Sequence, residues 1–447
     1  MPKDYGKSDV DEMLAKRKVP EQNITKQEMD AYLINVLEKP LSIEDATKLA
    51  LYRNSKIQNS YANLGFSAAN LYSAGRIRNP FITFKKLNSL DSDFRDLTNF
   101  SFGFSLGDII KLPSNIKTAK RNFLAAKQSA AAEILQSIRD VQVAYYEYVT
   151  AIQAARANNE FYNALETSAE FDQIDYEYGL ISKRELLELN VVIAEAKYNA
   201  IQADNDELAA RAKFANLLSL EIEDDWSIPD HLTIPIELDI DVDKLSETAK
   251  QTSLVLESQK TKIKELEEEV DLSKWRPYVG DIEIGLERAK TPVGATVTGP
   301  TLDVQIPLFN HHHDEQAIAR SNLIIALANL QQSSVEIQNN VYLNFHKTKR
   351  AKIVVDEYLE NLMPLRAEII ERARNHENYI LRGIFDIYDT NYNEYQSYIQ
   401  FSKIIKEYWI SYTDLRHAVG DSISYPSQQK VRLVPLKDLF ADEQFSQ

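Results

Sequence analysis

The sequence has no cysteine, and it has only 12 glycines and 14 prolines among 447 residues. Without cysteine the chain has no disulfide, no thiolate nucleophile and no cysteine-ligated zinc. Because glycine and proline mark most turns, their scarcity predicts few, long helices. Hydrophobic residues make up 44% and charged residues 26%, a composition that argues against wholesale disorder.

Long apolar runs are also missing. No stretch of about 20 apolar residues occurs, so no transmembrane helix is expected. Positive charge is in deficit, with 51 Lys and Arg against 67 Asp and Glu. The resulting net charge of -16 argues against nucleic acid as a partner and against non-specific attraction to anionic lipid. The opening Met1 to Asp4 does not resemble a secretory signal, which indicates either a mature form or a chain that is not exported.

Enzyme signatures are absent too. The sequence contains no phosphate loop, dinucleotide fingerprint, nucleophile elbow or zinc-protease motif, so we expect neither an enzyme nor a cofactor. One run has metal-ligand character, His311, His312 and His313 followed by Asp314 and Glu315. Adjacent histidines rarely converge on one ion, and acidic residues are typical of a helix start. A helix start is therefore favoured, with a metal site as the alternative.

What is present is a pattern that occurs twice, at a spacing close to half the chain. The segment LGDIIKLPSNIKTAKRN from Leu106 aligns with IPLFNHHHDEQAIARSN from Ile306. Each half predicts a helix, two strands, a long helix, a turn and a second long helix. The expected organisation is an arm over 1–40, a first repeat over 41–220, an acidic connector over 221–243, a second repeat over 244–420 and a tail over 421–447.

Strands are indicated by period-two alternation in both halves. Phe100, Phe102 and Phe104 alternate with serine and glycine, and we expect strand pairs at about 79–110 and 277–309. Such strands fit a membrane barrel, or a soluble sheet with one solvated face. A sheet in lipid must close, and known barrels have about eight strands or more. Four membrane strands per chain would therefore have to be completed by other copies.

The helices are predicted to be long hairpins, at about 115–218 and 315–417. Apolar residues follow Ile116 in steps of three and four, and Pro113 with the two polar residues after it predicts the helix start. A helix from there to about Tyr176 would span on the order of 90 Å and would need lateral partners. Aromatic residues between 392 and 412 are better explained as helical core than as a ligand-stacking track.

Three short segments together resemble the TolC-type outer-membrane efflux protein family. They are LSIEDATKLAL at Leu41 to Leu51, YGLIS at Tyr178 to Ser182, and IPLF at Ile306 to Phe309. The resemblance covers about Leu41 to Gly420. It implies a homotrimer in the Gram-negative outer membrane, mainly α with membrane β. Four strands per protomer would build a twelve-strand barrel, continued by a long α-helical barrel in the periplasm.

The resemblance also implies partners and site residues. A periplasmic adaptor protein and an inner-membrane transporter would complete the machine, and the two hairpin turns would contact the adaptor. Glycine in these turns is explained equally well by chain reversal alone. The residues concerned are Gly179, Leu180, Ile181 and Ser182 in the first turn, and Leu381, Arg382 and Gly383 in the second.

Asp386 and Asp389 follow the second turn at a spacing of three, which places both carboxylates on one helical face. In the family such a pair narrows the periplasmic entrance and selects cations; an ordinary solvated face is the alternative. The resemblance predicts an exit duct of a tripartite efflux pump. An exit duct for type I protein secretion, and a soluble helical scaffold, remain as alternatives.

Overall fold

The computed structural model describes residues 4–17, 19, 32, 39–88, 96–235, 237, 241–275, 282–291, 293–304, 313–377 and 384–420. The chain divides into two compact units. The first consists of residues 1–13, 60–132 and 254–336, and the second of residues 14–59, 133–253 and 337–447. Each unit thus takes segments from both halves of the sequence, so a unit is not the same as a half.

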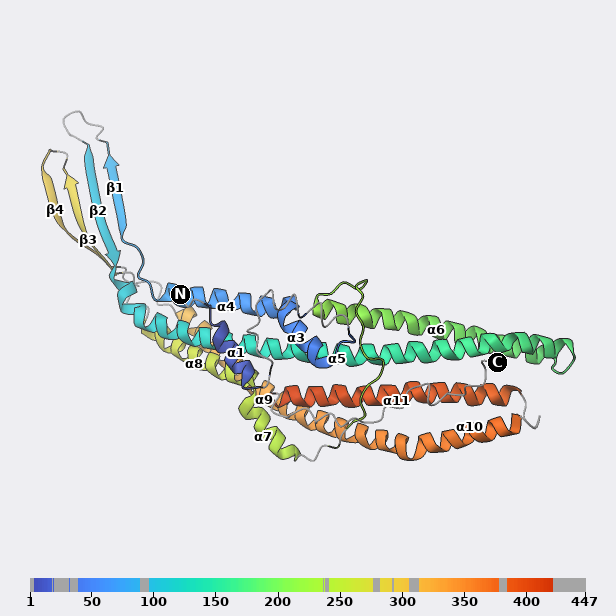
Figure 1. Ribbon diagram of the computed structural model, residues 1–447. Helices are drawn as coiled ribbons and strands as arrows, with labels where there is room; N and C mark the ends of the chain where they lie inside the picture. Colours follow the sequence, from blue (N-terminus) through green and yellow to red (C-terminus); the bar gives the residue numbers. More distant parts are fainter. Residues whose placement is uncertain are drawn as a thin grey trace. The chain divides into compact units, whose positions relative to one another are not determined.

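The elements follow the predicted order in both halves (Figure 1). The first half contains α1 (Lys7–Ala15), α3 (Ile43–Arg53), α4 (Ser55–Ala74), β1 (Phe81–Leu87), β2 (Leu97–Ser105), α5 (Leu106–Glu177) and α6 (Lys183–Leu218). The second contains α7 (Val242–Thr252), α8 (Leu254–Trp275), β3 (Ile282–Lys290), β4 (Thr296–Val304), α9 (His313–Glu357), the π-helical turn η2 (Tyr358–Leu362), α10 (Met363–Glu377) and α11 (Ile384–Ala418). Among the described helices, none is long and apolar enough to cross a bilayer.

Side-chain caps define the corner between α3 and α4. Ser42 Oγ accepts the backbone N–H of Asp45 at 3.1 Å, which starts α3. Asn54 is buried between the two helices, where its Nδ2 donates to the carbonyl of Leu217 at 2.7 Å. Its Oδ1 accepts the N–H of Lys56 at 2.8 Å. One asparagine therefore ends α3, starts α4 and ties both to the end of α6.

Helix α5 begins earlier than the sequence predicts. Its first residue is Leu106, whereas the pattern indicated a start near residue 115. The reason is a cap at the end of β2, where Ser105 Oγ accepts the N–H of Asp108 at 3.3 Å. Pro113 consequently lies inside the helix, which lacks one backbone hydrogen bond there because proline has no N–H.

A second proline explains the irregular turn between α9 and α10. Pro364 has no N–H to donate to the carbonyl of Glu360, four residues before it. The N–H of the preceding residue, Met363, reaches back five residues to the carbonyl of Tyr358. This wider spacing is the π-helical turn η2, which lets the helix continue past the proline.

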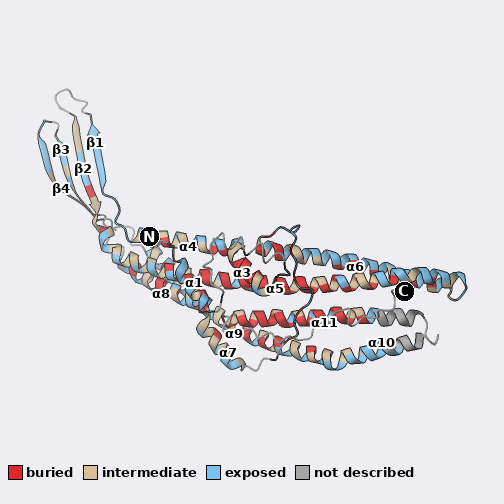
Figure 2. Ribbon diagram, in the orientation of Figure 1, coloured by how far each residue is buried: buried red, intermediate tan, exposed pale blue. Residues whose placement is uncertain are grey.

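The core of the second unit is rich in aromatic residues. Figure 2 shows buried stretches in α5 and α11. Tyr408 and Tyr412 of α11 and Phe214 of α6 are fully buried. The ring of Phe214 lies 5.9 Å from the ring of Tyr145 and 5.9 Å from that of Trp226. The aromatic residues towards the carboxyl end of α11 are therefore core residues, which confirms the interpretation of their spacing.

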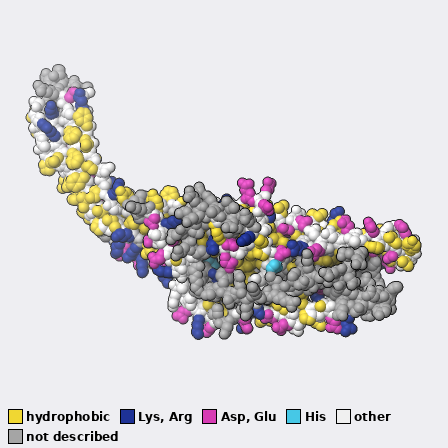
Figure 3. Space-filling model, viewed as in Figure 1, with side chains coloured by type: hydrophobic (Ala, Val, Ile, Leu, Met, Phe, Trp, Pro, Cys, Tyr) yellow, Lys and Arg dark blue, Asp and Glu magenta, His cyan; other side chains and the backbone are white. Residues whose placement is uncertain are grey.

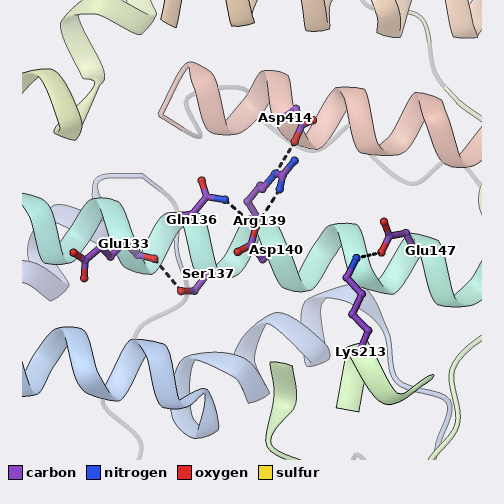
Figure 4. A network of polar contacts seen from close by, with 8 residues as sticks. All are labelled: Glu133, Gln136, Ser137, Arg139, Asp140, Glu147, Lys213 and Asp414. Carbon is purple, nitrogen blue, oxygen red and sulfur yellow. Dashed lines mark hydrogen bonds and ion pairs between the residues drawn. The ribbon is translucent and has the colours of Figure 1, made fainter. Parts of the chain in front are cut away.

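Ion pairs join α5 to its neighbours at the edge of this core (Figure 4). Arg139 Nε donates to Asp414 Oδ1 of α11 at 2.7 Å, and its Nη1 donates to Asp140 Oδ1 at 3.0 Å. Burial opposes the charge of Arg139, but these carboxylates outweigh it and raise its pKa. Lys213 of α6 pairs with Glu147 of α5. Because the pairs are partly exposed, they orient the helices more than they stabilise them.

The first unit holds its helices together through α8. Ser258 Oγ donates to the carbonyl of Ala125 in α5 at 3.1 Å, and Gln259 Nε2 donates to Ser333 Oγ of α9 at 2.9 Å. Helix α8 therefore contacts the long helix of each half. The same unit contains all four strands.

The strands form one antiparallel sheet in the order β1, β2, β3, β4. The central pair, β2 and β3, joins strands from the two halves of the sequence. Pairing of β3 with β4 continues to Lys290 and Thr296. Residues 305–310, which include the IPLF segment, lie outside the described residues.

Candidate functional site

The sheet sorts its side chains into two unlike faces. In antiparallel strands, directly opposed residues share a face, and alternate residues along one strand lie on opposite faces. Phe102 of β2 opposes Ile82 of β1 on one side and Leu286 of β3 on the other. Following this register gives an apolar face, which contains Ile82, Phe84, Phe100, Phe102, Phe104, Ile282, Ile284, Leu286, Pro300, Leu302 and Val304.

The opposite face, the polar face, carries every acidic residue of the strands. These are Glu283, Glu287 and Asp303. Asn99 Nδ2 donates to Glu287 Oε1 at 2.5 Å across β2 and β3. The remaining polar residues of this face are Thr83, Lys85, Ser101, Ser105 and Thr301, and its apolar members are Phe81, Leu87, Leu97, Ala289 and Val297.

The apolar face is uncovered in a single chain. The exposed fraction is 67% for Phe84, 59% for Leu286 and 66% for Leu302. Full burial of one such side chain is worth about 1.5–3 kcal/mol, so leaving the face in water is costly. A contiguous apolar surface of this kind is typical of a protein or membrane contact. The apolar face of one copy of the chain is thus left without a covering layer.

Both edges of the sheet are open. Among the described residues, β1 pairs only with β2, and β4 pairs only with β3. Each outer edge presents backbone N–H and C=O groups without a strand partner. If the apolar face lies in lipid, these groups need partners from another strand. In that case four strands would be an incomplete sheet.

Two opposed glycines bring β2 and β3 close together on the polar face. Gly103 opposes Gly285 in the register. A Cβ atom on Gly285 would lie 2.6 Å from the carbonyl oxygen of Phe102, and one on Gly103 would lie 2.7 Å from the ring of Phe81. A larger residue at either position would push the strands or the ring aside, so the sheet geometry requires glycine here.

Helix α6 carries two apolar seams on opposite sides. The buried seam, which includes Leu189, Ala196 and Ala203, packs within the second unit. The exposed seam consists of Leu187, Val191, Ala194, Tyr198, Ile201 and Leu208 at heptad spacing. The two series are offset by two residues, which is about 200° around a helix of 3.6 residues per turn. Leu187, Val191, Tyr198, Ile201 and Leu208 are all more than half exposed.

The turn between α5 and α6 has a well-defined geometry. Gly179 has φ +75°, and the N–H of Leu180 donates to the carbonyl of Asp175 at 2.8 Å, which closes the last turn of α5. Ser182 starts α6 through reciprocal bonds with Glu185. Ser182 Oγ accepts the N–H of Glu185 at 3.2 Å, and Glu185 Oε2 accepts the N–H of Ser182 at 2.6 Å. The second bond lowers the pKa of Glu185.

Exposed apolar side chains surround this turn. The exposed fraction is 80% for Tyr178, 73% for Leu180 and 66% for Phe171. Figure 3 shows hydrophobic side chains gathered at this end of the hairpin. Nothing lies within 4 Å of the position that a Cβ atom of Gly179 would occupy, so only its positive φ requires glycine. Chain reversal therefore accounts for Gly179, whereas it does not account for the exposed Leu180.

The other predicted site residues are only partly within the described structure. Leu381, Arg382 and Gly383 of the second turn lie outside it. Asp386 and Asp389 fall in the first turns of α11, which begins at Ile384, but their side chains are not among those described. The arrangement of this turn and of its carboxylates stays a prediction.

The histidine run falls at a helix start. His311 and His312 lie outside the described residues, and His313 is the first residue of α9. Asp314 and Glu315 occupy the first turn of that helix, in agreement with the favoured interpretation. Within the part of the chain that the structure describes, no group of three or more His, Asp or Glu side chains could hold a metal ion.

The exposed seam of α6 is the feature that the sequence analysis missed. Its heptad spacing is present in the sequence, but an apolar series two residues away predicts the same helix equally well. The structure leaves this second seam exposed, while the first one is buried. Burial in the folded chain was needed to tell which seam lacks a neighbour.

Comparison with known proteins gives a family match in the first half of the chain. Residues 47–219 match the model of the family described as outer membrane efflux protein. No curated protein matches the chain. The family match includes the α5–α6 hairpin and its glycine turn, and it confirms the resemblance inferred from the sequence.

Solved structures with the same fold cover most of the chain. The Campylobacter jejuni CmeC outer membrane channel has a TM-score of 0.73 at 14% identity, over 90% of this chain and 90% of that one. The Vibrio cholerae outer membrane protein VceC has a TM-score of 0.67 at 13% identity, over 85% and 96%. The open state of the Neisseria gonorrhoeae MtrE outer membrane channel has a TM-score of 0.67 at 14% identity, over 85% and 88%. The mainly helical fold with a four-strand sheet is therefore that of outer-membrane channels.

Proposed function

We propose that this chain, whose residues 47–219 match the outer membrane efflux protein family, is one protomer of a trimeric exit duct in the outer membrane. It conducts small molecules or metal ions passively to the exterior. An inner-membrane transporter and a periplasmic adaptor deliver the cargo, and the long helices form the periplasmic tunnel.

The open, two-faced sheet is the observation that carries this proposal. In lipid, the apolar face would lie against acyl chains and the polar face would line a water-filled lumen. The unpaired edges of β1 and β4 would bond to β4 and β1 of neighbouring copies, since a sheet in lipid must close. Three copies of four strands give the expected twelve-strand barrel.

The exposed seam of α6 supports the same assembly from the helical part. Its residues would pack laterally on a helix of a neighbouring protomer, as the buried seam packs within its own chain. A water-soluble monomer would leave both the seam and the apolar face exposed, which argues against the soluble scaffold.

The first test is a mass measurement in detergent followed by single-channel recording in a planar bilayer. We expect a particle of three times 51.1 kDa that inserts spontaneously and conducts ions. A monomer that stays soluble without detergent and never conducts would support the scaffold and refute the duct.

The first hairpin turn is the proposed adaptor contact, formed by Gly179, Leu180, Ile181 and Ser182. Its exposed apolar groups suit a protein surface, and the second turn, Leu381 to Gly383, would present the corresponding contact. Replacing Leu180 by aspartate should abolish efflux in a strain that depends on this duct, while trimers still assemble and conduct. Lys183→Gln, beside the turn, is the matched control. Unchanged drug susceptibility with Leu180→Asp would contradict the contact.

Asp386 and Asp389 are proposed as the cation-selective entrance. Three copies would place six carboxylates around one opening, where a low dielectric strengthens their field. The double variant Asp386→Ala with Asp389→Ala should weaken block by trivalent cations added on the periplasmic side. Block of wild-type strength would remove the acidic ring.

Cargo distinguishes efflux from the alternative of type I protein secretion. In a strain lacking this chain, an efflux duct should restore resistance to a toxic small molecule or metal. A secretion duct should instead restore the export of a protein. Restored protein export without restored resistance would favour the alternative.

A further inference from the structure

The apolar face of the sheet is not apolar along its whole length. Towards the hairpin ends of the strands it carries Lys86 on β1 and Arg288 and Lys290 on β3. Lys86 and Lys290 both oppose Thr98 of β2, and Arg288 opposes Phe100. The register therefore places all three cations, which we term the basic rim, on the face that carries the phenylalanines. Figure 3 shows basic side chains near this end of the sheet.

Charge in the strands is sorted by sign between the two faces. Three of the four basic strand residues lie in the basic rim, and only Lys85 lies on the polar face. All three acidic strand residues lie on the polar face. The acidic residues and most of the basic residues thus lie on opposite faces of the sheet, as expected if the two faces meet different surroundings. The chain's net charge of -16 does not determine the local field, because salt screens charges more than about 8 Å apart.

The basic rim keeps most of its charge available. Lys86 Nζ pairs with Asp96 at 3.1 Å, beside the hairpin. Arg288 and Lys290 are exposed, and neither forms an ion pair with an acidic side chain among the described residues. Threonine hydroxyls share the same rows of the apolar face, from Thr98, Thr296 and Thr298. Two cations without an acidic partner in the described part of the chain, with hydroxyl groups beside them, are a donor set suited to phosphate oxygens.

A ligand for this rim must be amphipathic. Phe84, Phe100 and Leu286 directly adjoin the basic rim on the same face, so one bound molecule can contact both apolar and cationic side chains. The chemistry required is a lipid with phosphate on its headgroup and acyl chains beneath it. Cations at the border of a membrane attract anionic headgroups by about 1 kcal/mol each.

We propose that the basic rim binds the phosphate groups of lipid A, the glycolipid of the exterior leaflet of the outer membrane. The inference rests on the proposed function, because the hairpin ends face the exterior leaflet only if the barrel spans the membrane. The acyl chains then lie on the phenylalanines, and Arg288 and Lys290 hold the phosphates. Both lipids carry phosphate, but they differ in the leaflet they occupy. Lipid A is favoured because it belongs to the exterior leaflet, towards which the hairpin ends of a spanning barrel point.

The test uses the full-length trimer in a neutral detergent, with its thermal dissociation midpoint followed during lipid titration. The probes are diphosphoryl lipid A, monophosphoryl lipid A, phosphatidylglycerol and phosphatidylcholine. We expect diphosphoryl lipid A to stabilise the trimer at the lowest concentration, and phosphatidylcholine to have the weakest effect. The variant Arg288→Gln with Lys290→Gln should raise the half-maximal concentration of diphosphoryl lipid A about 30-fold. Lys85→Gln, which removes a charge from the polar face, should leave it unchanged.

The outcomes separate this inference from the proposed function. If the wild-type trimer forms and conducts but responds equally to diphosphoryl lipid A and phosphatidylcholine, the duct stands and the lipid site is refuted. A stronger response to phosphatidylglycerol than to diphosphoryl lipid A would refute the choice of lipid A. An equal loss of response in Lys85→Gln would refute the assignment to the apolar face. If no trimer forms at all, the proposed function fails first.

Discussion

The exposed seam of α6 allows a direct test of lateral assembly. The proposed change is Ile201→Glu together with Leu208→Glu, two seam residues whose side chains are 55% and 56% exposed. Glutamate is at least as good a helix former as isoleucine, so the helix itself should not suffer. The control is Gln202→Glu, which adds one carboxylate next to Ile201 but outside the seam. Within the protomer, each change should alter the free energy of folding by no more than about 0.5 kcal/mol.

The magnitude expected for the trimer is much larger. About half of each side chain remains to be buried, and full burial of isoleucine or leucine is worth about 1.5–3 kcal/mol, so each contact contributes about 1 kcal/mol. Two residues in three interfaces give about 6 kcal/mol per trimer. Burying the new carboxylates adds a further penalty of several kcal/mol for each one that finds no partner.

The measurement is sedimentation in detergent across a dilution series, with circular dichroism to verify helix content. We expect the double variant to dissociate at concentrations where the wild type and Gln202→Glu remain trimeric, while all three keep the same helix content. A double variant that keeps the wild-type mass and dissociation midpoint would mean that the seam faces water, and the lateral contact would have to be abandoned.

Three further predictions concern single residues. Gly179→Val should destabilise the turn by about 1–2 kcal/mol, whereas Gly179→Asn should cost less because asparagine tolerates a positive φ; hydrogen exchange at the turn amides distinguishes them. Phe214→Ala, in contact with Trp226, should cost about 3–5 kcal/mol, seen as a lower urea midpoint, and a loss below 1 kcal/mol would contradict its place in the core. Burial raises the pKa of Glu394, and the charge of Arg366 offsets this increase only in part. The folded chain therefore keeps the proton of Glu394 at a pH where the unfolded chain has lost it. The free energy of unfolding consequently falls as the pH rises from the ordinary carboxyl pKa to the higher pKa of the folded state. Glu394→Gln should therefore raise the melting temperature at pH 8 but not at about pH 4, and an equal effect at both would refute this account.

Local signals in the sequence predicted most of the secondary structure because each depends on neighbouring residues. Alternation of Phe100, Phe102 and Phe104 with small polar residues predicts a strand with unlike faces, and the structure contains β2 there. The start of α5 was misplaced because Pro113 is a strong local breaker. The cap at the end of β2, in which Ser105 Oγ accepts the N–H of Asp108, starts the helix earlier. This cap outweighs the helix-breaking tendency of Pro113.

The candidate site was only partly predictable. The glycine turn at Gly179 was readable, because a left-handed residue at a helix end follows from local chemistry. The exposure of Leu180 and of the α6 seam could not be predicted from the sequence, because exposure depends on which helices pack against each side. The basic rim needed the strand register, since Lys86 and Lys290 are more than 200 residues apart in the sequence and share a face only through β2.

The sequence by itself determined the element order, the long helices and the alternation of the strands, because periodicity and caps act over a few residues. The tertiary structure alone decided how β2 and β3 pair, which of the two α6 seams stays exposed, and which charges share a face with the phenylalanines. These properties join residues far apart in the chain. They depend on long-range packing and register, which local propensity does not encode.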